Sequence, residues 1–201
     1  MRVLIACGGT GGHINPGLAI ADIIKSKYPD TEFLFAGTPK GMEAKLVPAA
    51  GYRFETIKVA GFQRRISLEN IGRNAKAVAY LITSGRRAKQ IIEGFKPDIA
   101  IGTGGYAAGP VIRKAARMGI PTAIHEQNAY PGVTNKLLSK EVDHVMLTVK
   151  EALNFMDGSK FEHTVTGLPV RSNIKNSISR AEARKKLGFN DDFTILSFGG
   201  S

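Results

Sequence analysis

The side chains and turns that could do chemistry lie at three places in the sequence. The first is a glycine-rich turn at residues 8–13 (GGTGGH), between a short apolar segment and a helical pattern. Glycine lets the backbone approach a ligand closely, and a helix N-terminus presents unpaired N–H groups at the positive end of its dipole. The turn is therefore typical of a phosphate or sugar-phosphate site, although a tight turn between strand and helix also needs glycine for steric reasons alone.

The other two places have the same position relative to the predicted elements. Residues 102–106 (GTGGY) again follow a strand-like segment and precede a helix, and residues 125–128 (HEQN) stand where the next strand ends. In an open α/β sheet, ligands bind in the crevice at the carboxyl ends of the strands. The sequence therefore predicts that the three segments line one site.

Several familiar kinds of site do not fit these residues. The dinucleotide pattern G-x-G-x-x-G would place Ile14 at its third glycine, and the second strand has no acidic residue at its end. A P-loop requires Gly-Lys-Ser/Thr, but no lysine precedes Lys25. The four histidines and the single cysteine, Cys7, show no metal-ligand spacing. We expect neither a metal nor another cofactor.

Short β-branched runs alternate with helical patterns along the chain. Strands are expected at residues 3–6, 32–36, 53–59, 98–102, 122–125, 144–147 and 162–166. Helices are expected at residues 16–27, 42–49 and 74–94, and an exposed loop at residues 60–72. Strands separated by helices form βαβ units, so the predicted fold is a doubly wound α/β domain with a parallel sheet.

Composition narrows the possible partners and the compartment. The chain has 201 residues and a net charge of +11, an excess that favours an anionic partner. One cysteine allows no internal disulfide and suits a reducing compartment. There is no signal peptide pattern and no run of about 20 apolar residues, so we expect a cytosolic protein. A nucleic-acid partner is not expected, because no recognition motif is present.

The alternation breaks at residues 167–171 (GLPVR). After the break, Ser179 is expected to begin a helix over residues 181–187, followed by a strand over residues 193–198 and a glycine-rich end, GGS. This order predicts a first domain at residues 1–166, a linker at residues 167–178 and the start of a second domain at residues 179–201. We expect an engineered end inside the first βα unit of that domain. The segment after Arg171 is expected to be loosely held, or paired with another copy of the chain through its exposed strand.

Together, the GGTGGH, TGGY, HEQN and GGS segments resemble the bacterial MurG-type N-acetylglucosaminyltransferases. The resemblance implies a GT-B fold of two Rossmann-like domains, of which this chain is the N-terminal, acceptor-side part. It implies inverting transfer of GlcNAc from UDP-GlcNAc to lipid I (undecaprenyl-diphosphate-MurNAc-pentapeptide), which gives lipid II, at the cytoplasmic face of the cell membrane. The 201 residues alone are expected to be inactive.

Site residues follow from the resemblance by position. Donor-binding residues would be Thr10, Gly11, Gly12, Asn128, Arg171 and Ser201. Catalytic roles are assigned to His13 and Glu126, and the acceptor side to Gly104, Gly105 and Tyr106. Five of these residues could instead have simpler structural roles. His13 could cap the helix, and Glu126 could hold its own loop. Tyr106 could belong to the scaffold, Asn128 could form hydrogen bonds to nearby backbone, and Arg171 could be an exposed linker residue. Leu168 departs from the family, which has asparagine there.

The chemistry implied by the resemblance needs a proton acceptor and a site for the leaving diphosphate. The acceptor hydroxyl loses a proton as it attacks the anomeric carbon, and UDP leaves with developing negative charge. An imidazole such as that of His13 suits the first task, since histidine titrates near neutral pH. Glycine-rich N–H groups and Arg171 suit the second.

The basic helical segment is a candidate membrane contact. Its side chains combine apolar and cationic types, namely Arg73, Lys76, Val78, Leu81, Ile82 and Arg86. An apolar stripe bordered by cations is typical of a peripheral contact with an anionic membrane surface. The alternative is a core-facing stripe with a solvated charged face.

Two rival functions keep the fold. One is a related glycolipid synthase that acts on diacylglycerol, and the other is a non-enzymatic module that binds sugar nucleotides. A diphosphate-linked acceptor would be required only by the lipid I enzyme.

Overall fold

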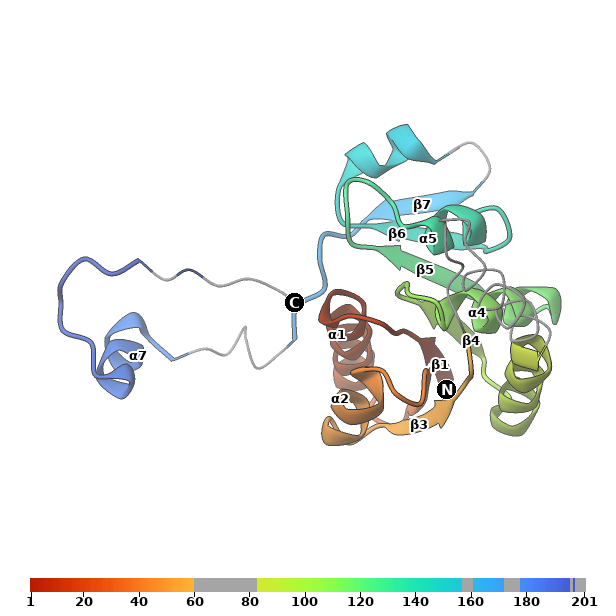
Figure 1. Ribbon diagram of the computed structural model, residues 1–201, viewed down its shortest axis with the longest axis horizontal. Coiled ribbons are helices and arrows are strands. Elements are labelled where there is room, and N and C mark those ends of the chain that lie inside the picture. The colour runs from red at the N-terminus through yellow and green to blue at the C-terminus, as the bar shows by residue number, and fades with distance from the viewer. Residues whose placement is uncertain (60–82, 157–160, 172–177, 196, 198–201) are drawn as a thin grey trace, which may run out of the picture.

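A computed structural model describes residues 1–59, 83–156, 161–171, 178–195 and 197. Its centre is a seven-stranded sheet in which every neighbouring pair of strands is parallel, in the order β3-β2-β1-β4-β5-β6-β7 (Figure 1). The strands are β1 Arg2–Ala6, β2 Glu32–Gly37, β3 Arg53–Thr56, β4 Ile99–Gly102, β5 Thr122–Glu126, β6 His144–Leu147 and β7 Glu162–Val165. The doubly wound parallel sheet predicted from the sequence is confirmed.

Helices connect the strands and cover the sheet. They are α1 Gly11–Lys27, α2 Glu43–Ala49, α4 Ala108–Arg117, α5 Val133–Leu138 and α7 Arg180–Leu187, with a 3-10 helix η1 at Lys150–Phe155. Residues 83–95 are also helical and are the described part of the helix predicted over residues 74–94. The loop predicted at residues 60–72 lies outside the described residues.

The side chains of β1 point alternately to the two faces of the sheet and contribute to a separate hydrophobic core on each face. Leu4 and Ala6 pack with residues of the 83–95 helix and α4, whereas Val3 and Ile5 pack with α1. Successive side chains of a strand point to opposite faces, so a strand that is apolar throughout must be covered on both sides. The uninterrupted apolar run at residues 3–6 is thus explained by helices on both faces.

The strand order places a switch point beside β1. The chain runs from β1 outward through β2 to β3, and then returns to β4 on the other side of β1. The connections that leave β1 and β4 therefore go in opposite directions and open a crevice at their carboxyl ends. Both glycine-rich turns, at residues 8–13 and 102–106, border this crevice.

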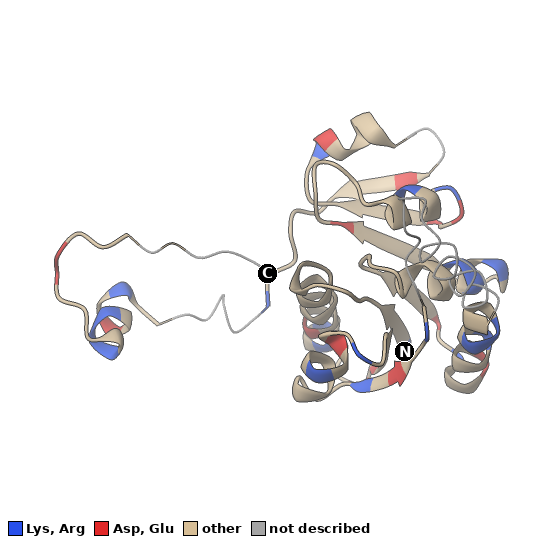
Figure 2. Cartoon of the chain, viewed as in Figure 1, with Lys and Arg blue, Asp and Glu red and all other residues tan. Residues whose placement is uncertain are grey.

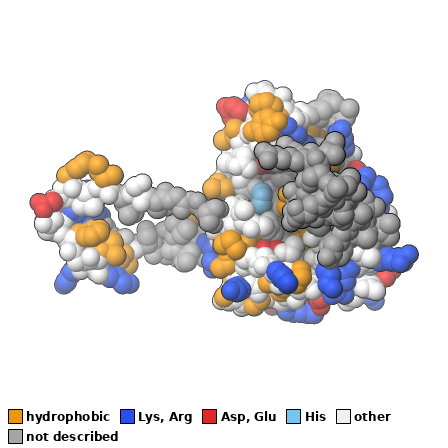
Figure 3. Space-filling view, viewed as in Figure 1, with side chains coloured by type: hydrophobic (Ala, Val, Ile, Leu, Met, Phe, Trp, Pro, Cys, Tyr) orange, Lys and Arg blue, Asp and Glu red, His pale blue; other side chains and the backbone are white. Residues whose placement is uncertain are grey.

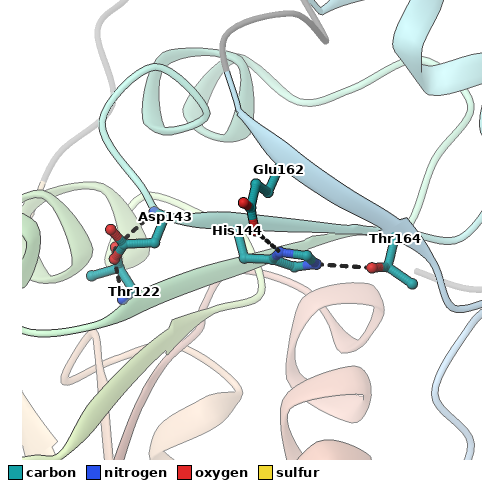
Figure 4. A network of polar contacts seen from close by, with 5 residues as sticks. All are labelled: Thr122, Asp143, His144, Glu162 and Thr164. Carbon is teal, nitrogen blue, oxygen red and sulfur yellow. Dashed lines mark hydrogen bonds and ion pairs between the residues drawn. The ribbon is translucent and has the colours of Figure 1, made fainter.

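A polar network fixes the opposite edge, where β5, β6 and β7 begin (Figure 4). One oxygen of Asp143 accepts hydrogen bonds from the backbone N–H (2.7 Å) and the hydroxyl (2.8 Å) of Thr122. Nε2 of His144 lies 3.0 Å from Oγ1 of Thr164, and its Nδ1 lies 3.9 Å from a carboxylate oxygen of Glu162. These bonds tie three strands together far from the crevice.

Element boundaries differ from the prediction by more than one residue at two places in the described residues. Helix α1 begins at Gly11 rather than at residue 16, so the second half of the glycine-rich turn is its first turn. Strand β3 ends at Thr56, three residues before the predicted end.

The last part of the chain departs further from the prediction. Helix α7 is present and is capped by Ser179 as expected, but it buries none of its residues. The strand predicted at residues 193–198 is not formed over residues 193–195, where Phe193 is 91% and Ile195 79% exposed. A strand needs a neighbour to pair with, and the described part of the chain offers none at this position. None of the helices in the described residues is long and apolar enough to cross a membrane.

Candidate active site

The two glycine-rich turns pack directly against each other. A Cβ atom on Gly105 would lie 2.0 Å from the carbonyl oxygen of Gly8, and one on Gly104 would lie 2.7 Å from Nδ1 of His13. Both residues also have positive φ, +81° and +99° respectively, which side chains other than glycine rarely adopt. Glycine at 104 and 105 therefore brings the second turn, and the residues around it, into contact with the first.

A buried carboxylate that the sequence analysis did not single out holds the first turn in place. Glu43, the first residue of α2, is fully buried and accepts hydrogen bonds from the backbone N–H of Gly9 (3.2 Å) and of Thr38 (2.8 Å), and from the Thr38 hydroxyl (2.6 Å). It stands 34 residues from the turn, so no local motif indicates the contact. Burial, with a smaller contribution from Glu43, raises the pKa of the nearby Cys7 thiol to about 12. The thiol is therefore not a nucleophile at neutral pH.

His13 lies where the three predicted segments meet. Its carbonyl oxygen accepts a hydrogen bond from the Thr103 hydroxyl (2.7 Å), and its Nδ1 lies 3.1 Å from Oε1 of Gln127. These contacts join the turns after β1 and β4 to the end of β5, as the sequence predicts. In the view of Figure 3 a histidine side chain is exposed near the middle of the surface, beside uncharged side chains.

Gln127 and His125 continue the network behind His13. Nε2 of Gln127 lies 3.0 Å from the carbonyl oxygen of Thr103, and 2.9 Å from the carbonyl oxygen and 3.1 Å from Nδ1 of His125. Nε2 of His125 in turn lies 3.1 Å from the carbonyl oxygen of Gly167. Burial lowers the pKa of His125, which favours its neutral form. The network thus extends from the glycine-rich turn to the first residue of the predicted linker.

Glu126 is buried, and both of its oxygens bond to its own loop. Oε1 accepts from the backbone N–H (2.9 Å) and the side-chain amide (3.0 Å) of Asn128. Oε2 accepts from the N–H of Gly132 (3.0 Å) and the side-chain amide of Asn135 (2.8 Å). This arrangement favours the alternative in which Glu126 holds the loop, and its catalytic role stays an untested prediction.

The remaining predicted contacts around the crevice differ in exposure. Thr10, Gly12 and Asn128 are exposed and Gly11 is half-buried, so a ligand could reach the N-terminus of α1. Tyr106 is 64% exposed, which suits a ligand-facing surface better than a packed scaffold. Their roles in binding stay predictions.

Arg171 lies beside α1. Its Nε is 3.9 Å from a carboxylate oxygen of Asp22, whose other oxygen accepts a 2.7 Å hydrogen bond from the Tyr52 hydroxyl. Burial, reinforced by this hydrogen bond, raises the pKa of Tyr52. Arg171 thus lies within ion-pair distance of α1, and its contact with a donor stays a prediction. Leu168 is exposed. Ser201 lies outside the described residues.

Most of the predicted membrane contact cannot be placed. Arg73, Lys76, Val78, Leu81 and Ile82 lie outside the described residues, and Arg86 is exposed on the 83–95 helix. Figure 2 shows further Lys and Arg residues along this helix and along α4. No group of three or more His, Cys, Asp or Glu in the described residues is arranged to hold a metal ion.

Comparisons with known proteins bear on the family and the fold of the chain. Residues 3–147 match the glycosyltransferase family 28 N-terminal domain. Over its whole length the chain is 52% identical to a protein of Acetivibrio thermocellus and 48% identical to one of Ruminiclostridium cellulolyticum, covering 53% and 54% of them. Both relatives are named UDP-N-acetylglucosamine--N-acetylmuramyl-(pentapeptide) pyrophosphoryl-undecaprenol N-acetylglucosamine transferase. The chain spans about half the length of the curated relatives it matches.

Solved structures share the fold. The crystal structure of MurG from Acinetobacter baumannii superposes with a TM-score of 0.64 at 28% identity, covering 81% of this chain and 45% of that one. A UDP-GlcNAc 2-epimerase from Neisseria meningitidis superposes with a TM-score of 0.53 at 15% identity, covering 82% of this chain and 46% of the epimerase, a likeness of fold alone.

Proposed function

The chain belongs to glycosyltransferase family 28, and from this membership we propose that it is the acceptor-side half of a transferase that moves GlcNAc from UDP-GlcNAc to lipid I. The product would be lipid II, the disaccharide precursor of peptidoglycan. Identity of 52% over all 201 residues to a relative named for this reaction supports the substrate assignment.

The observation that carries the proposal is the meeting of three segments around His13 at the switch point of the sheet. Thr103 fixes the backbone of His13, and Gln127 fixes its ring. Crevices at such switch points are where α/β proteins of this kind bind their ligands. That His13 is held at this crevice supports its proposed role as the group that accepts the proton of the acceptor hydroxyl.

The first turn of α1 would supply backbone groups that stabilise the negative charge of the leaving diphosphate. Thr10 and Gly12 are exposed at the helix N-terminus, and their backbone can face a diphosphate as negative charge develops on it. His13 in the same turn would accept the proton of the attacking hydroxyl. Proton transfer and charge stabilisation would then be placed side by side by one short segment. Asn128, Arg171 and Ser201 would complete the donor side.

We also propose that the protein works as a peripheral protein on an anionic membrane. The acceptor carries a polyprenyl chain that stays in the bilayer, so the enzyme has to approach the membrane surface. Basic side chains along the 83–95 helix, including the exposed Arg86, suit contact with anionic headgroups.

The proposal can be tested with a joined transferase, in which this chain is fused to the C-terminal half of the Acetivibrio thermocellus relative. The assay measures UDP release from UDP-GlcNAc. Release that depends on a lipid I analogue and falls at least about 100-fold in His13→Ala is expected. The matched control is His163→Ala, an exposed histidine on β7, which should retain activity. Release with diacylglycerol instead of lipid I would replace the proposal with the glycolipid synthase, and silence with both acceptors would leave a binding module.

A further inference from the structure

Gln127 enters the proposed reaction only as a neighbour of the His13 ring, yet its side chain lies between two histidines and two backbone carbonyls. We propose that Gln127 is a positioning residue: it holds the His13 imidazole in the tautomer that carries its proton on Nδ1, leaving Nε2 as the nitrogen that accepts a proton. This inference rests on the proposed role of His13.

The orientation of the Gln127 amide is fixed by its surroundings. One end of the amide lies 3.0 Å from the carbonyl oxygen of Thr103 and 2.9 Å from that of His125. Backbone carbonyls only accept hydrogen bonds, so the NH₂ group must face them. The reversed orientation would bring an amide oxygen against two other oxygens and leave the NH₂ facing His13.

The amide orientation determines the tautomer of His13. With the NH₂ group facing the carbonyls, Oε1 faces Nδ1 of His13 at 3.1 Å and can only accept. Nδ1 must then donate, and a neutral imidazole has a single N–H, so its Nε2 carries a lone pair. Among the described residues, Nε2 of His13 has no hydrogen-bond partner. This nitrogen is left to a reacting hydroxyl.

Two further features keep the His13 ring in place. The Thr103 hydroxyl bonds to the carbonyl oxygen of His13, and the absence of a side chain at Gly104 leaves room for the ring. His125 supports Gln127 from behind: its Nε2 faces the carbonyl oxygen of Gly167, so this nitrogen carries the proton and Nδ1 can accept from Gln127. His125 is thereby neutral and places no cation beside His13.

The tautomer can be read directly by ¹⁵N NMR of the imidazole nitrogens in the 201-residue chain. We expect neutral His13 to be protonated at Nδ1 in the wild type and to shift toward the Nε2-protonated form in Gln127→Met. Gln90→Met, at an exposed position of the 83–95 helix, is the matched control and should leave the His13 signals unchanged. An Nε2-protonated His13 in the wild type, or unchanged signals in Gln127→Met, would overturn the proposal. If Gln127→Met fails to fold, Gln127→Asn, whose shorter amide cannot span the same gap, should produce the same shift.

Kinetics of the joined transferase give the second readout. Gln127→Met is expected to lower kcat about 10- to 100-fold while changing KM for UDP-GlcNAc by less than about 2-fold. In a His13→Ala background the same substitution should cause no further loss, because Gln127 acts through His13. An equal loss in both backgrounds would mean a merely structural role and would overturn the proposal. A wild type without lipid I-dependent turnover would count against the proposed function, and the NMR result would then decide on Gln127 alone.

Discussion

Glu43 and Glu126 are buried carboxylates that have no lysine or arginine partner among the described residues. Each is stabilised instead by N–H and O–H donors of the loops at the carboxyl edge of the sheet. A carboxylate that accepts several such bonds holds the donor segments in one conformation. At the scale of the residue, these two side chains shape the site by fixing the backbone around His13, the residue proposed to react.

Because both carboxylate oxygens of Glu126 accept hydrogen bonds, replacing this residue should lower the free energy of unfolding. In Glu126→Gln either orientation of the amide turns its NH₂ group toward two donors, on Asn128 or on Gly132 and Asn135. We expect a loss of about 1–3 kcal/mol in the free energy of unfolding, measured by urea denaturation. Glu93→Gln, at a half-exposed helix position, should cost less than about 0.5 kcal/mol. A variant of unchanged stability whose kcat collapses would instead favour Glu126 as the base.

His125 gives stability a dependence on pH. Burial lowers its pKa in the folded state below the ordinary value near 6.5, so between the two values the unfolded chain binds more protons than the folded one. The free energy of unfolding should therefore fall as the pH falls below about 6.5. Denaturation curves between pH 7.5 and about 5 should show this slope, and His125→Gln should flatten it. His163→Gln, an exposed position, should retain the slope; if it removes the slope as well, His125 is not the cause.

At the scale of the element, the packing of one turn on another depends on glycine. Gly105→Ala would force a Cβ against the carbonyl oxygen of Gly8 and place alanine at positive φ. The expected loss in the free energy of unfolding is more than about 2 kcal/mol, measured by thermal or urea unfolding. Gly94→Ala, in the helix of residues 83–95 with open space around it, should be neutral or stabilising by up to about 1 kcal/mol. Equal effects at both positions would contradict this account of the turns.

Helix α7 depends on its own caps because it buries nothing. The Ser179 side chain accepts from the N–H of Glu182. The Glu182 carboxylate in turn accepts from the hydroxyl (2.7 Å) and from the backbone N–H (2.9 Å) of Ser179, and these two bonds lower the pKa of Glu182. Ser179→Ala should cost the helix about 1 kcal/mol, seen as faster amide exchange at residues 180–187. The melting temperature of the sheet should not change. The capping contribution of Glu182 should also be lost as the pH falls through its lowered pKa. A drop in the melting temperature of the whole domain with Ser179→Ala would show that α7 is packed.

At the scale of the whole molecule, the proposed reaction needs more than this sheet. His13 and the first turn of α1 lie on one side of a crevice, and the resemblance places the uridine pocket after Ser201. The 201-residue chain alone should therefore fold but release no UDP from UDP-GlcNAc, with or without a lipid I analogue. The joined transferase, assayed in parallel, is the positive control. Appreciable turnover by the chain alone would show that one domain suffices.

The sequence by itself predicted the seven strands of the sheet, helices α1, α2 and α7, the helix of residues 83–95 and the segments that form the site, whereas α5 and η1 were not predicted. These features depend on local patterns: apolar runs of four or five residues, helical periodicity, and glycine after a strand. Parallel strands with both faces covered then place the ends of β1, β4 and β5 along one edge. The strand predicted at residues 193–198 is not formed over the described residues 193–195 for the opposite reason, since a strand depends on a partner that a local pattern does not supply.

Only the tertiary structure decided which partners the side chains in the site contact. His13 and Gln127 are 114 residues apart, and Gly9 and Glu43 are 34 apart, so nothing local indicates either contact. The structure also showed that both oxygens of Glu126 bond to its loop and that Arg171 lies beside Asp22. Residue type establishes that a group can bond or titrate. Which partner it meets depends on direction and distance in the folded chain, and hydrogen bonds are sensitive to both.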